Sequence, residues 1–308
     1  MRKKFSIIGA GQVGGTAAFI AALRELGDIV IVNRTAGMAQ GKALDIAEAS
    51  PILGFDSKVI GTGNYSEIKN SDIVIITSGL QRTPGMSREE LLNKNAEIIK
   101  DVCANVKKYA NKAILIVVTN PLDAMVYAAM KFTRFPKQRL IGMAGTLDSS
   151  RFRSFIAMEL GVSVKDIYAM VLGSHGDLMV PLTMYCTVAG IPLTELLPKE
   201  KIEKIVERTR NAGAEILDLE KESSAFYAPG AAIIDIVEAI AHDKKRILPC
   251  AAYLEGEYGI KGIFLGVPAL IGSNGIERVI ELKLNKEESD ALRKSADAIK
   301  ELLKDLKI

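Results

Sequence analysis

His175 is the residue in this sequence best suited to acid–base chemistry. It is one of two histidines and lies in "LGSHGD", between glycines that follow an apolar run. Glycines beside an imidazole free the backbone to present the ring and leave room for a ligand. An imidazole has an unperturbed pKa of about 6.5, so it can accept and return a proton near neutrality. The other histidine, His242 in "IAHDKK", is expected to be a solvated or capping residue at a helix end.

An aspartate and several arginines could serve that imidazole and an anionic ligand. Asp148 and Arg151 are three residues apart in "TLDSSRFR", on one face of a predicted helix. They could form a surface ion pair worth very little. Alternatively, Asp148 orients the imidazole and favours its protonated form, while Arg151 binds a carboxylate through two parallel hydrogen bonds. Arg82 and Arg88 lie in "SGLQRTPGMSREE", which is either an ordinary exposed loop or one that closes over a ligand and delivers cations to it.

A glycine-rich turn near the N-terminus predicts a dinucleotide site. Gly9, Gly11 and Gly14 in "FSIIGAGQVGG" have G-x-G-x-x-G spacing between a predicted strand and a predicted helix. Gly9 permits a tight turn, Gly11 lets the backbone approach a pyrophosphate, and Gly14 allows close packing of helix on strand. A merely structural glycine turn is the alternative. About 20 residues beyond such a turn an acidic residue is usual, but this chain has Asn33 followed by Arg34.

The elements that must position these residues alternate along the first half of the chain. Runs rich in Ile and Val predict strands within residues 4–9, 28–33, 57–63, 72–79 and 113–121. They lack a polar face, which is typical of parallel strands covered on both sides. Helical spacing occurs at 12–25, 38–49 and 87–109, and in "PLDAMVYAAMKF". The pattern predicts an α/β fold, a Rossmann doubly wound parallel sheet, over residues 1–145.

The second half, residues 146–308, predicts a mixed α+β domain that binds substrate and carries catalytic residues. Helices are expected at 146–160, at 198–222 and at 286–306. Strands are expected at 166–173, 182–190, 247–254 and 262–271. No internal repeat or low-complexity linker separates the halves, so the two domains are expected to pack closely.

Composition narrows the functional classes. The 40 basic and 37 acidic residues are interspersed, with no basic stripe of the kind that binds nucleic acid. No apolar run is long enough to predict a membrane span, and the run before Gly9 is too short for a signal peptide. The three cysteines are far apart in the sequence, which fits a reducing, cytoplasmic location. No cysteine or histidine spacing predicts a metal site.

Taken together, the segments resemble the lactate/malate dehydrogenase family, specifically its lactate-dehydrogenase-like malate dehydrogenases. The resemblance spans nearly the whole chain, in the family's order. It is carried by "IIGAGQVG", "TSGLQRTPGMSR", "VVTNPLDAM", "LDSSRFR", "GSHGDLMVPL", "AFYAPGAA" and "LGVPALIG".

The resemblance implies a role for each matching residue. His175 matches the proton acceptor, Asp148 its orienting partner, and Arg151 the residue that binds the C1 carboxylate. Arg88, on a mobile loop, matches the residue that polarises the reacting carbonyl, and Asn120 contacts both substrate and cofactor. The expected cofactor contacts are Gly9, Ala10, Gly11, Gln12, Val13, Gly14, Asn33, Arg34, Thr35, Asn95, Val118 and Asn120.

Two segments of the sequence bear on substrate and cofactor choice. Arg82 occupies the position where lactate-type relatives commonly have an uncharged residue, so a C4 dicarboxylate, malate or oxaloacetate, is expected. Asn33 replaces the Asp of close relatives, which would repel the extra phosphate of NADP, and Arg34 and Thr35 could bind that phosphate. We therefore expect NADP to be accepted and moderately favoured. The alternative is NAD, with Asn33 bound to the free ribose and Arg34 pointing into solvent.

Several alternatives stay open. Lactate or another 2-hydroxy acid could be the substrate. A non-enzymatic alternative is a regulatory module that senses a dinucleotide without catalysis. Family resemblance further implies a homodimer or homotetramer, with no nucleic acid or membrane partner.

Overall fold

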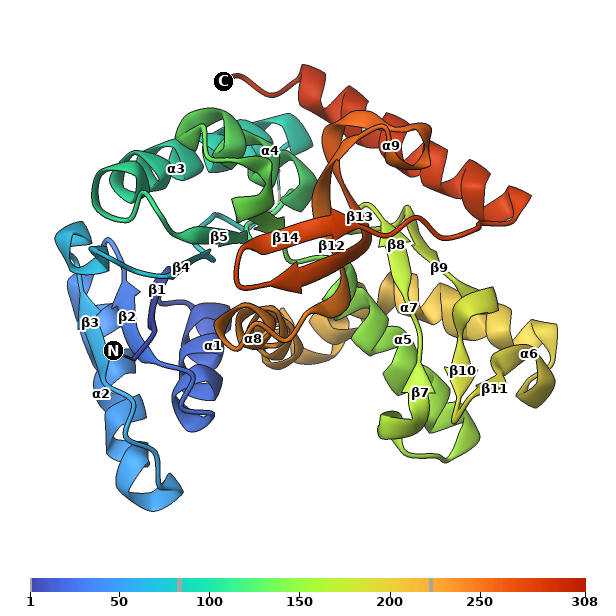
Figure 1. The fold of residues 1–308 in the computed structure, drawn as a ribbon, viewed down its shortest axis with the longest axis horizontal. Coiled ribbons are helices and arrows are strands. Elements are labelled where there is room, and N and C mark those ends of the chain that lie inside the picture. Colours follow the sequence, from blue (N-terminus) through green and yellow to red (C-terminus); the bar gives the residue numbers. More distant parts are fainter. Residues whose placement is uncertain (1, 82–84, 222–223) are drawn as a thin grey trace.

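The first half of the chain forms the parallel part of a large sheet (Figure 1). The computed structural model describes residues 2–81, 85–221 and 224–308. Adjacent strands run in the order β3-β2-β1-β4-β5-β6, and each pair is parallel. These strands are β1 (Lys4–Ile8), β2 (Asp28–Val32), β3 (Val59–Thr62), β4 (Ile73–Ile76), β5 (Ile114–Val117) and β6 (Leu140–Gly142). This order is that of a doubly wound dinucleotide-binding sheet, and the predicted α/β fold class is confirmed.

Both faces of the parallel strands are covered, as their uniformly apolar sequences predict. Successive side chains point to opposite faces, so Ile7 packs in one apolar cluster and Ile8 in the other. In Figure 1, α3 and α4 lie on one side of these strands and α1 and α8 on the other. The helices of this half are α1 (Gln12–Leu23), α2 (Ala36–Leu53), α3 (Arg88–Tyr109) and α4 (Leu122–Thr133), with 3-10 turns η1 (Tyr65–Ile68) and η2 (Lys137–Arg139).

The sheet continues without a break into the second half of the chain. Strand β12 pairs antiparallel with β6 at Ala251 and Gly142, where a Cβ on the glycine would lie 2.7 Å from the Ala251 Cβ. Beyond it the order is β12-β13-β8-β9, and β14 pairs with β13. The strands are β8 (Val171–Gly173), β9 (Met179–Pro181), β12 (Arg246–Glu255), β13 (Lys261–Gly272) and β14 (Gly275–Val279). The described residues thus form one 11-stranded sheet shared by both halves.

Among the described residues, a small separate sheet and five helices complete the second half. The order of the small sheet is β11-β10-β7, from β7 (Ile167–Tyr168), β10 (Thr187–Val188) and β11 (Ile191–Pro192). The helices are α5 (Gly145–Leu160), α6 (Leu193–Leu196), α7 (Lys199–Glu220), α8 (Tyr227–Ala241) and α9 (Lys286–Lys304), with 3-10 turns η3 (Val164–Asp166), η4 (Thr183–Tyr185) and η5 (Glu257–Gly259).

Two strand predictions in this half were wrong in detail. Residues 166–173 contain two short strands, β7 and β8, that belong to different sheets. Residues 182–190 contain the turn η4 and only the two-residue strand β10. The apolar residues there, such as Cys186 and Val188, fill a cluster beneath α5 and α7, and only Thr187 and Val188 pair in a strand. Burial against helices therefore produced an apolar pattern that resembles a strand.

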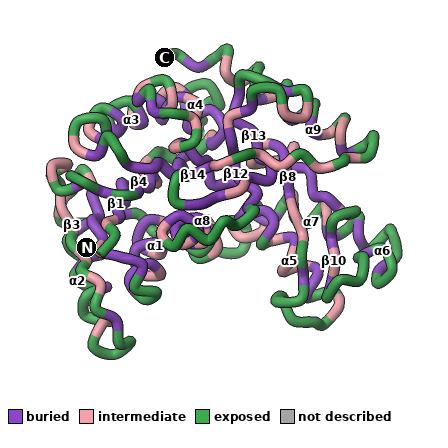
Figure 2. Tube along the Cα trace, viewed as in Figure 1, coloured by how far each residue is buried: buried purple, intermediate pink, exposed green. Residues whose placement is uncertain are grey.

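Helix α8 joins the two halves by packing against α1. Gly230 allows this approach, because a Cβ there would lie 2.6 Å from the Thr16 Cγ2. Buried residues concentrate in the central strands and in the facing sides of these helices, whereas α2 and α7 are largely exposed (Figure 2). Among the described residues, no helix combines the length and apolarity needed to cross a membrane.

Candidate active site and cofactor cradle

The glycine turn connects β1 to α1 at the carboxyl edge of the parallel strands. Gly9 has φ +119°, a backbone conformation that L side chains rarely adopt. A Cβ on Gly14 would lie 2.0 Å from the Gly9 carbonyl oxygen, so the third glycine is required by close packing. A Cβ on Gly11, in contrast, would meet no atom within 4 Å. The second glycine thus faces open space, as it must where a ligand approaches the backbone.

The first turn of α1 is suited to bind an anion. Its N-cap, Gly11, has no side chain to accept hydrogen bonds from the first N–H groups, and the first turn contains no acidic residue. Unpaired N–H groups and the positive end of the helix dipole together attract phosphate. Beside this turn, Ala10 is buried, Val13 is half-buried and Gln12 is exposed. The residues present therefore fit the pyrophosphate of a dinucleotide.

Asn33 links the end of β2 to the glycine turn. Its Oδ1 accepts a hydrogen bond from the Ala10 backbone N–H at 3.3 Å, and its Nδ2 donates to the Thr35 carbonyl at 3.2 Å. Arg34 and Thr35 are exposed next to it. Within the part of the chain that the structure describes, Arg34 makes no hydrogen bond or ion pair. A guanidinium and a hydroxyl are thus available at the place where an adenosine ribose is expected.

Asn95, an expected cofactor contact, hydrogen-bonds to the backbone of two loops. Its side chain is fully buried, and its Oδ1 accepts from the Leu80 N–H at 2.7 Å. Its Nδ2 donates to the Leu80 carbonyl at 3.1 Å and to the Asn120 carbonyl at 2.7 Å. Asn95 therefore holds together the two loops that follow β4 and β5, which include the half-buried Val118.

Three predicted residues meet in one hydrogen-bonded chain. His175 lies in the loop between β8 and β9, and its Nδ1 donates to the Asp148 Oδ2 at 2.9 Å. The Asp148 Oδ1 accepts from the Arg151 Nη1 at 3.2 Å. The side chain of Asp148 is 2% exposed, compared with 17% for His175 and 14% for Arg151. The geometry thus differs from that of a surface ion pair, because a buried carboxylate bridges an imidazole and a guanidinium.

The electrostatics of this cluster favour the protonated imidazole. Burial lowers the pKa of His175, but the charge of Asp148 and its hydrogen bond outweigh burial. Arg151 opposes this effect, and the nearby carboxyl of Asp123 supports it, so that the net pKa lies above its usual value. With Nδ1 engaged by Asp148, Nε2 is left to exchange a proton with a ligand. The ring is therefore set up as an acid and base near neutral pH.

Arg151 retains capacity for a further acceptor. Its Nε is buried and has no hydrogen-bond partner among the described residues. Gly213 of α7 lies beside the guanidinium, since a Cβ there would be 3.8 Å from Nη2. A planar guanidinium with an unused donor suits a carboxylate, which can accept two parallel hydrogen bonds.

The structure describes only one of the two other predicted arginines, Arg82 and Arg88. Arg82 lies outside the described residues. Arg88 is the first residue of α3 and is exposed, so that it belongs to the helix and not to the mobile loop on which the family resemblance placed it. The reason is local, because Ser87 caps the helix by accepting from the Glu90 N–H at 3.0 Å. Among the described residues Arg88 has no hydrogen-bond or ion-pair partner, which leaves it available to an anion.

Two residues near His175 were not predicted. Asp123, in the first turn of α4, accepts from the His175 backbone N–H at 3.2 Å. Ser295 of α9 accepts from the Ser174 N–H at 2.6 Å. A signal existed only for Asp123, which is the sole charged residue of "PLDAMVYAAM" and comes three residues after Asn120. The other histidine, His242, is the C-cap of α8, as expected.

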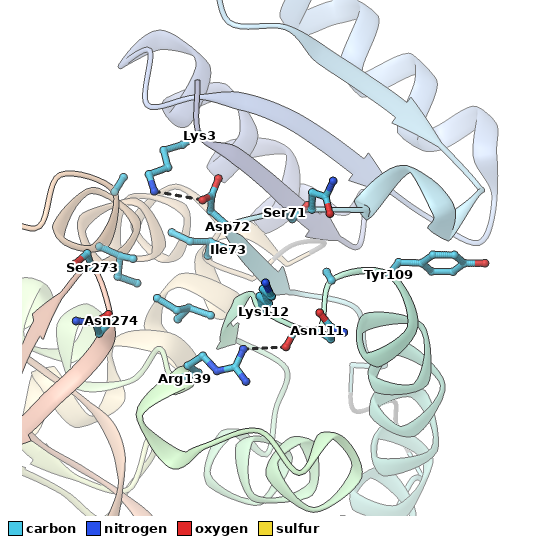
Figure 3. A pocket seen from close by; sticks show the side chains of 15 residues that line it. Lys3, Ser71, Asp72, Ile73, Tyr109, Asn111, Lys112, Arg139, Ser273 and Asn274 are labelled. Carbon is cyan, nitrogen blue, oxygen red and sulfur yellow. Dashed lines mark hydrogen bonds and ion pairs between the residues drawn. The ribbon is translucent and has the colours of Figure 1, made fainter. Parts of the chain in front are cut away.

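A cavity of about 450 Å³ lies at the opposite edge of the sheet (Figure 3). It is lined by residues that precede β1, β4 and β5, including Lys3, Asp72 and Lys112. Lys3 pairs with Asp72 at 3.3 Å, and Arg139 donates to the Asn111 carbonyl at 2.9 Å. Ligands of doubly wound sheets bind at the carboxyl ends of the strands. This cavity is therefore separate from the predicted site.

Comparison with known proteins identifies the family. Residues 3–142 match the model of the lactate/malate dehydrogenase NAD binding domain, and residues 145–307 match that of the lactate/malate dehydrogenase alpha/beta C-terminal domain. The chain belongs to the lactate/malate dehydrogenase family. The family resemblance stated from the motifs is thus confirmed.

Individual relatives include both substrate types of this family. A malate dehydrogenase of Roseiflexus castenholzii is 54% identical over 307 residues, which cover 100% of this chain and 99% of the relative. The malate dehydrogenase structure of Cryptosporidium parvum superposes with a TM-score of 0.97 at 43% identity, covering 99% of both chains. The lactate dehydrogenase of Cryptosporidium parvum, complexed with lactic acid and NAD, has a TM-score of 0.95 at 44% identity, with 99% and 98% covered.

Proposed function

We propose that this protein is a malate dehydrogenase that interconverts (S)-malate and oxaloacetate with a nicotinamide dinucleotide. The observation that carries the proposal is the chain from Arg151 through Asp148 to His175, in a sequence that aligns from end to end with malate dehydrogenases. The reaction removes a proton from a hydroxyl oxygen and a hydride from the adjacent carbon. A bound nicotinamide supplies the hydride acceptor, and the chain's own residues do the rest.

His175 manages the proton in this proposal. In malate oxidation the neutral ring accepts the hydroxyl proton at Nε2, and in oxaloacetate reduction the imidazolium returns it. Asp148 fixes the tautomer, because Nδ1 keeps its hydrogen for the carboxylate in both protonation states. It also stabilises the imidazolium that forms during oxidation. The raised pKa of His175 is consistent with this use of both forms near neutrality.

Arginines hold the anionic substrate. Arg151 binds the C1 carboxylate with the donors that Asp148 does not use. Arg88 at the start of α3 stabilises negative charge on the reacting oxygen, and Asn120 binds the same oxygen. Arg82 pairs with the second carboxylate of oxaloacetate. Pyruvate presents only a methyl group at that position. Without Arg82, enclosing the second carboxylate of oxaloacetate would cost several kcal/mol, so Arg82 sets the preference for a C4 dicarboxylate.

Cofactor choice depends on the end of β2. Asn33 adds no negative charge beside the ribose, and Arg34 and Thr35 are exposed and available to a phosphate monoester. We propose that NADP is accepted and moderately favoured, and that NAD is also used. The glycine turn and the N-terminus of α1 bind the pyrophosphate that both cofactors share.

A lactate dehydrogenase is the second candidate, because one solved relative of nearly the same fold was crystallised with lactic acid. Initial rates with oxaloacetate and pyruvate, each with NADH and NADPH, separate the possibilities. We expect oxaloacetate to be preferred by orders of magnitude. A higher kcat/KM for pyruvate would overturn the malate proposal.

A non-catalytic dinucleotide sensor makes a different prediction for His175→Asn. A sensor would work without the imidazole, whereas the enzyme should lose turnover and still bind NAD(P)H. Fluorescence titration of the reduced cofactor measures binding independently of turnover. Retention of the wild-type rate by His175→Asn would contradict catalysis through this ring.

We also propose that the enzyme is a cytoplasmic homodimer or homotetramer. The support is the family resemblance together with the three cysteines, which are all free and buried. Light scattering coupled to size-exclusion chromatography measures the oligomeric state, and a monomer at working concentrations would refute this part of the proposal.

A further inference from the structure

A buried carboxyl lies beside His175 and has no part in the roles proposed above. Asp123 is 5% exposed, and its Oδ2 accepts from the His175 backbone N–H at 3.2 Å. Its Oδ1 is buried without a hydrogen-bond partner among the described residues. A buried, incompletely hydrogen-bonded carboxyl costs folding free energy. Its presence therefore calls for a reason other than stability.

We propose that Asp123 is a positioning residue that holds the His175 loop through its backbone and, in its ionised form, supports the imidazolium with a second negative charge. This inference rests on the proposed role of His175 as the acid and base. It adds a residue on α4 that controls when the ring is protonated. Because Asp123 comes three residues after Asn120, the same helix start ties the substrate-binding loop to the imidazole.

The His175 loop has two backbone anchors that differ in charge. Ser295 of α9 accepts from the Ser174 N–H at 2.6 Å with a neutral hydroxyl. Asp123 of α4 accepts from the next N–H along the chain with a carboxyl. The oxygen of a hydroxyl or amide could also accept a hydrogen bond from that N–H. What a carboxyl adds at this position is charge next to the ring.

The charged groups around the ring come from two helices and act in both directions. From α5, Asp148 favours the imidazolium and Arg151 opposes it. From α4, Asp123 favours it. The carboxylate of Asp148 is shared with Arg151, so that its charge is partly neutralised. Asp123 offsets the remaining repulsion between the guanidinium and the imidazolium.

Asp123 can change its own protonation together with the ring. Burial raises the pKa of Asp123 to about 7, with a further rise from Asp148, while the charge and N–H of His175 act against it. Because the folded pKa lies above the usual value, the carboxyl contributes stability at low pH that is lost as the pH rises through about 7. Asp123→Asn, which carries no charge, should therefore fold at least as well as the wild type above neutral pH.

The test uses the full chain and its small number of histidines. With two histidines in the sequence, ¹³Cε1-labelled histidine gives two ring signals, and His242→Asn assigns them. Asp123→Asn keeps an acceptor for the His175 N–H and removes the charge, and we expect it to lower the pKa of His175 by about one pH unit. The matched control, Ser295→Ala, removes the neighbouring anchor without changing charge and should leave that pKa at its wild-type value.

Kinetics supply the second readout. The pH above which oxaloacetate reduction declines should fall in Asp123→Asn by the same amount as the pKa measured by NMR. Asp123→Ala loses charge and anchor together, so we expect a kcat lower than that of Asp123→Asn at every pH, with KM for oxaloacetate less affected. Melting temperatures show whether each variant is folded, and Asp123→Ser, smaller and neutral, replaces Asp123→Asn if the amide does not fit.

A wild-type His175 pKa and pH profile in the folded neutral variants would overturn the inference and leave Asp123 a structural residue. A failure of the proposed function looks different. The wild type would then lack oxaloacetate reduction, while the NMR titration would still report whether Asp123 acts on the ring.

Discussion

Replacing Asp148 with asparagine tests the central hydrogen bond of the proposed mechanism. Asp148→Asn preserves size but removes the charge that faces both His175 Nδ1 at 2.9 Å and Arg151 Nη1 at 3.2 Å. The amide group can present Nδ2 to Nδ1, which reverses the hydrogen bond and favours the tautomer with hydrogen on Nε2. In that tautomer the ring cannot accept the hydroxyl proton. We therefore expect malate oxidation to fall by about 10²- to 10⁴-fold.

The electrostatic part of the effect can be estimated separately. Unit charges about 4 Å apart attract by roughly 4 kcal/mol at an effective dielectric constant of about 20, which sets an upper limit of about 3 pH units on the pKa change. The actual change should be smaller, because Arg151 shares the carboxylate and the side chain of His175 is 17% exposed. We expect the pKa of His175 to fall by about 1 to 2 pH units in Asp148→Asn.

The assay is the pH dependence of kcat/KM in both directions. Reduction requires the imidazolium, so its decline with rising pH should begin at lower pH in Asp148→Asn. Oxidation requires the neutral ring, so its rise with pH should also begin at lower pH, although at a much reduced plateau. A variant with both midpoints unchanged, or with rates within a few-fold of wild type, would refute the assigned role of Asp148.

Four further substitutions test the cofactor site and the substrate arginine. Asn33→Asp should place a negative charge beside the ribose and lower kcat/KM for NADPH relative to NADH by about 10- to 100-fold in initial-rate assays; an unchanged ratio would show that the phosphate lies elsewhere. Gly14→Ala should lower the melting temperature, because its Cβ would lie 2.0 Å from the Gly9 carbonyl oxygen. Gly11→Ala, whose Cβ meets no atom within 4 Å, should remain as stable as the wild type but bind NAD(P)H more weakly in fluorescence titrations. Arg82→Gln should move the ratio of oxaloacetate to pyruvate activity toward pyruvate by more than about tenfold, and a constant ratio would remove this arginine from the specificity argument.

The parallel half of the fold could be predicted because its information is local. Five of the six described strands there are short Ile- and Val-rich runs that end at a turn, and the three-residue strand β6 was not predicted. The third glycine's packing role follows directly from its spacing after Gly9. The prediction failed at residues 182–190, where apolar residues fill a cluster beneath helices and only Thr187 and Val188 pair in a short strand. It also omitted β14, which follows β13 after a two-residue turn and is only partly buried. Short strands at a sheet edge have too little apolar pattern to be distinguished from a loop.

Only those residues of the candidate site could be predicted whose type and local spacing indicate a chemical role without knowledge of the fold. A histidine between glycines and an Asp three residues before an Arg indicate possible acid–base and anion chemistry without any fold. Ser295 and Asp123, which anchor the His175 loop, give no such indication. Their roles can be inferred only when the backbone N–H groups that they bind are known. Asn95 illustrates the same limit, since its buried amide joins two loops through backbone carbonyls and an N–H that no motif records.

The imidazole is positioned by residues far from it in the sequence. Asp148 is 27 residues away from His175, Asp123 is 52 residues away, and Ser295 is 121 residues from the Ser174 that it anchors. These partners lie on α5, α4 and α9, which the continuous sheet holds in fixed relation. A substitution that shifts α9 or α4 therefore alters the ring's orientation or pKa without touching a ligand. The pH dependence of turnover is thus a property of how the two halves of the sheet join, and not of His175 alone.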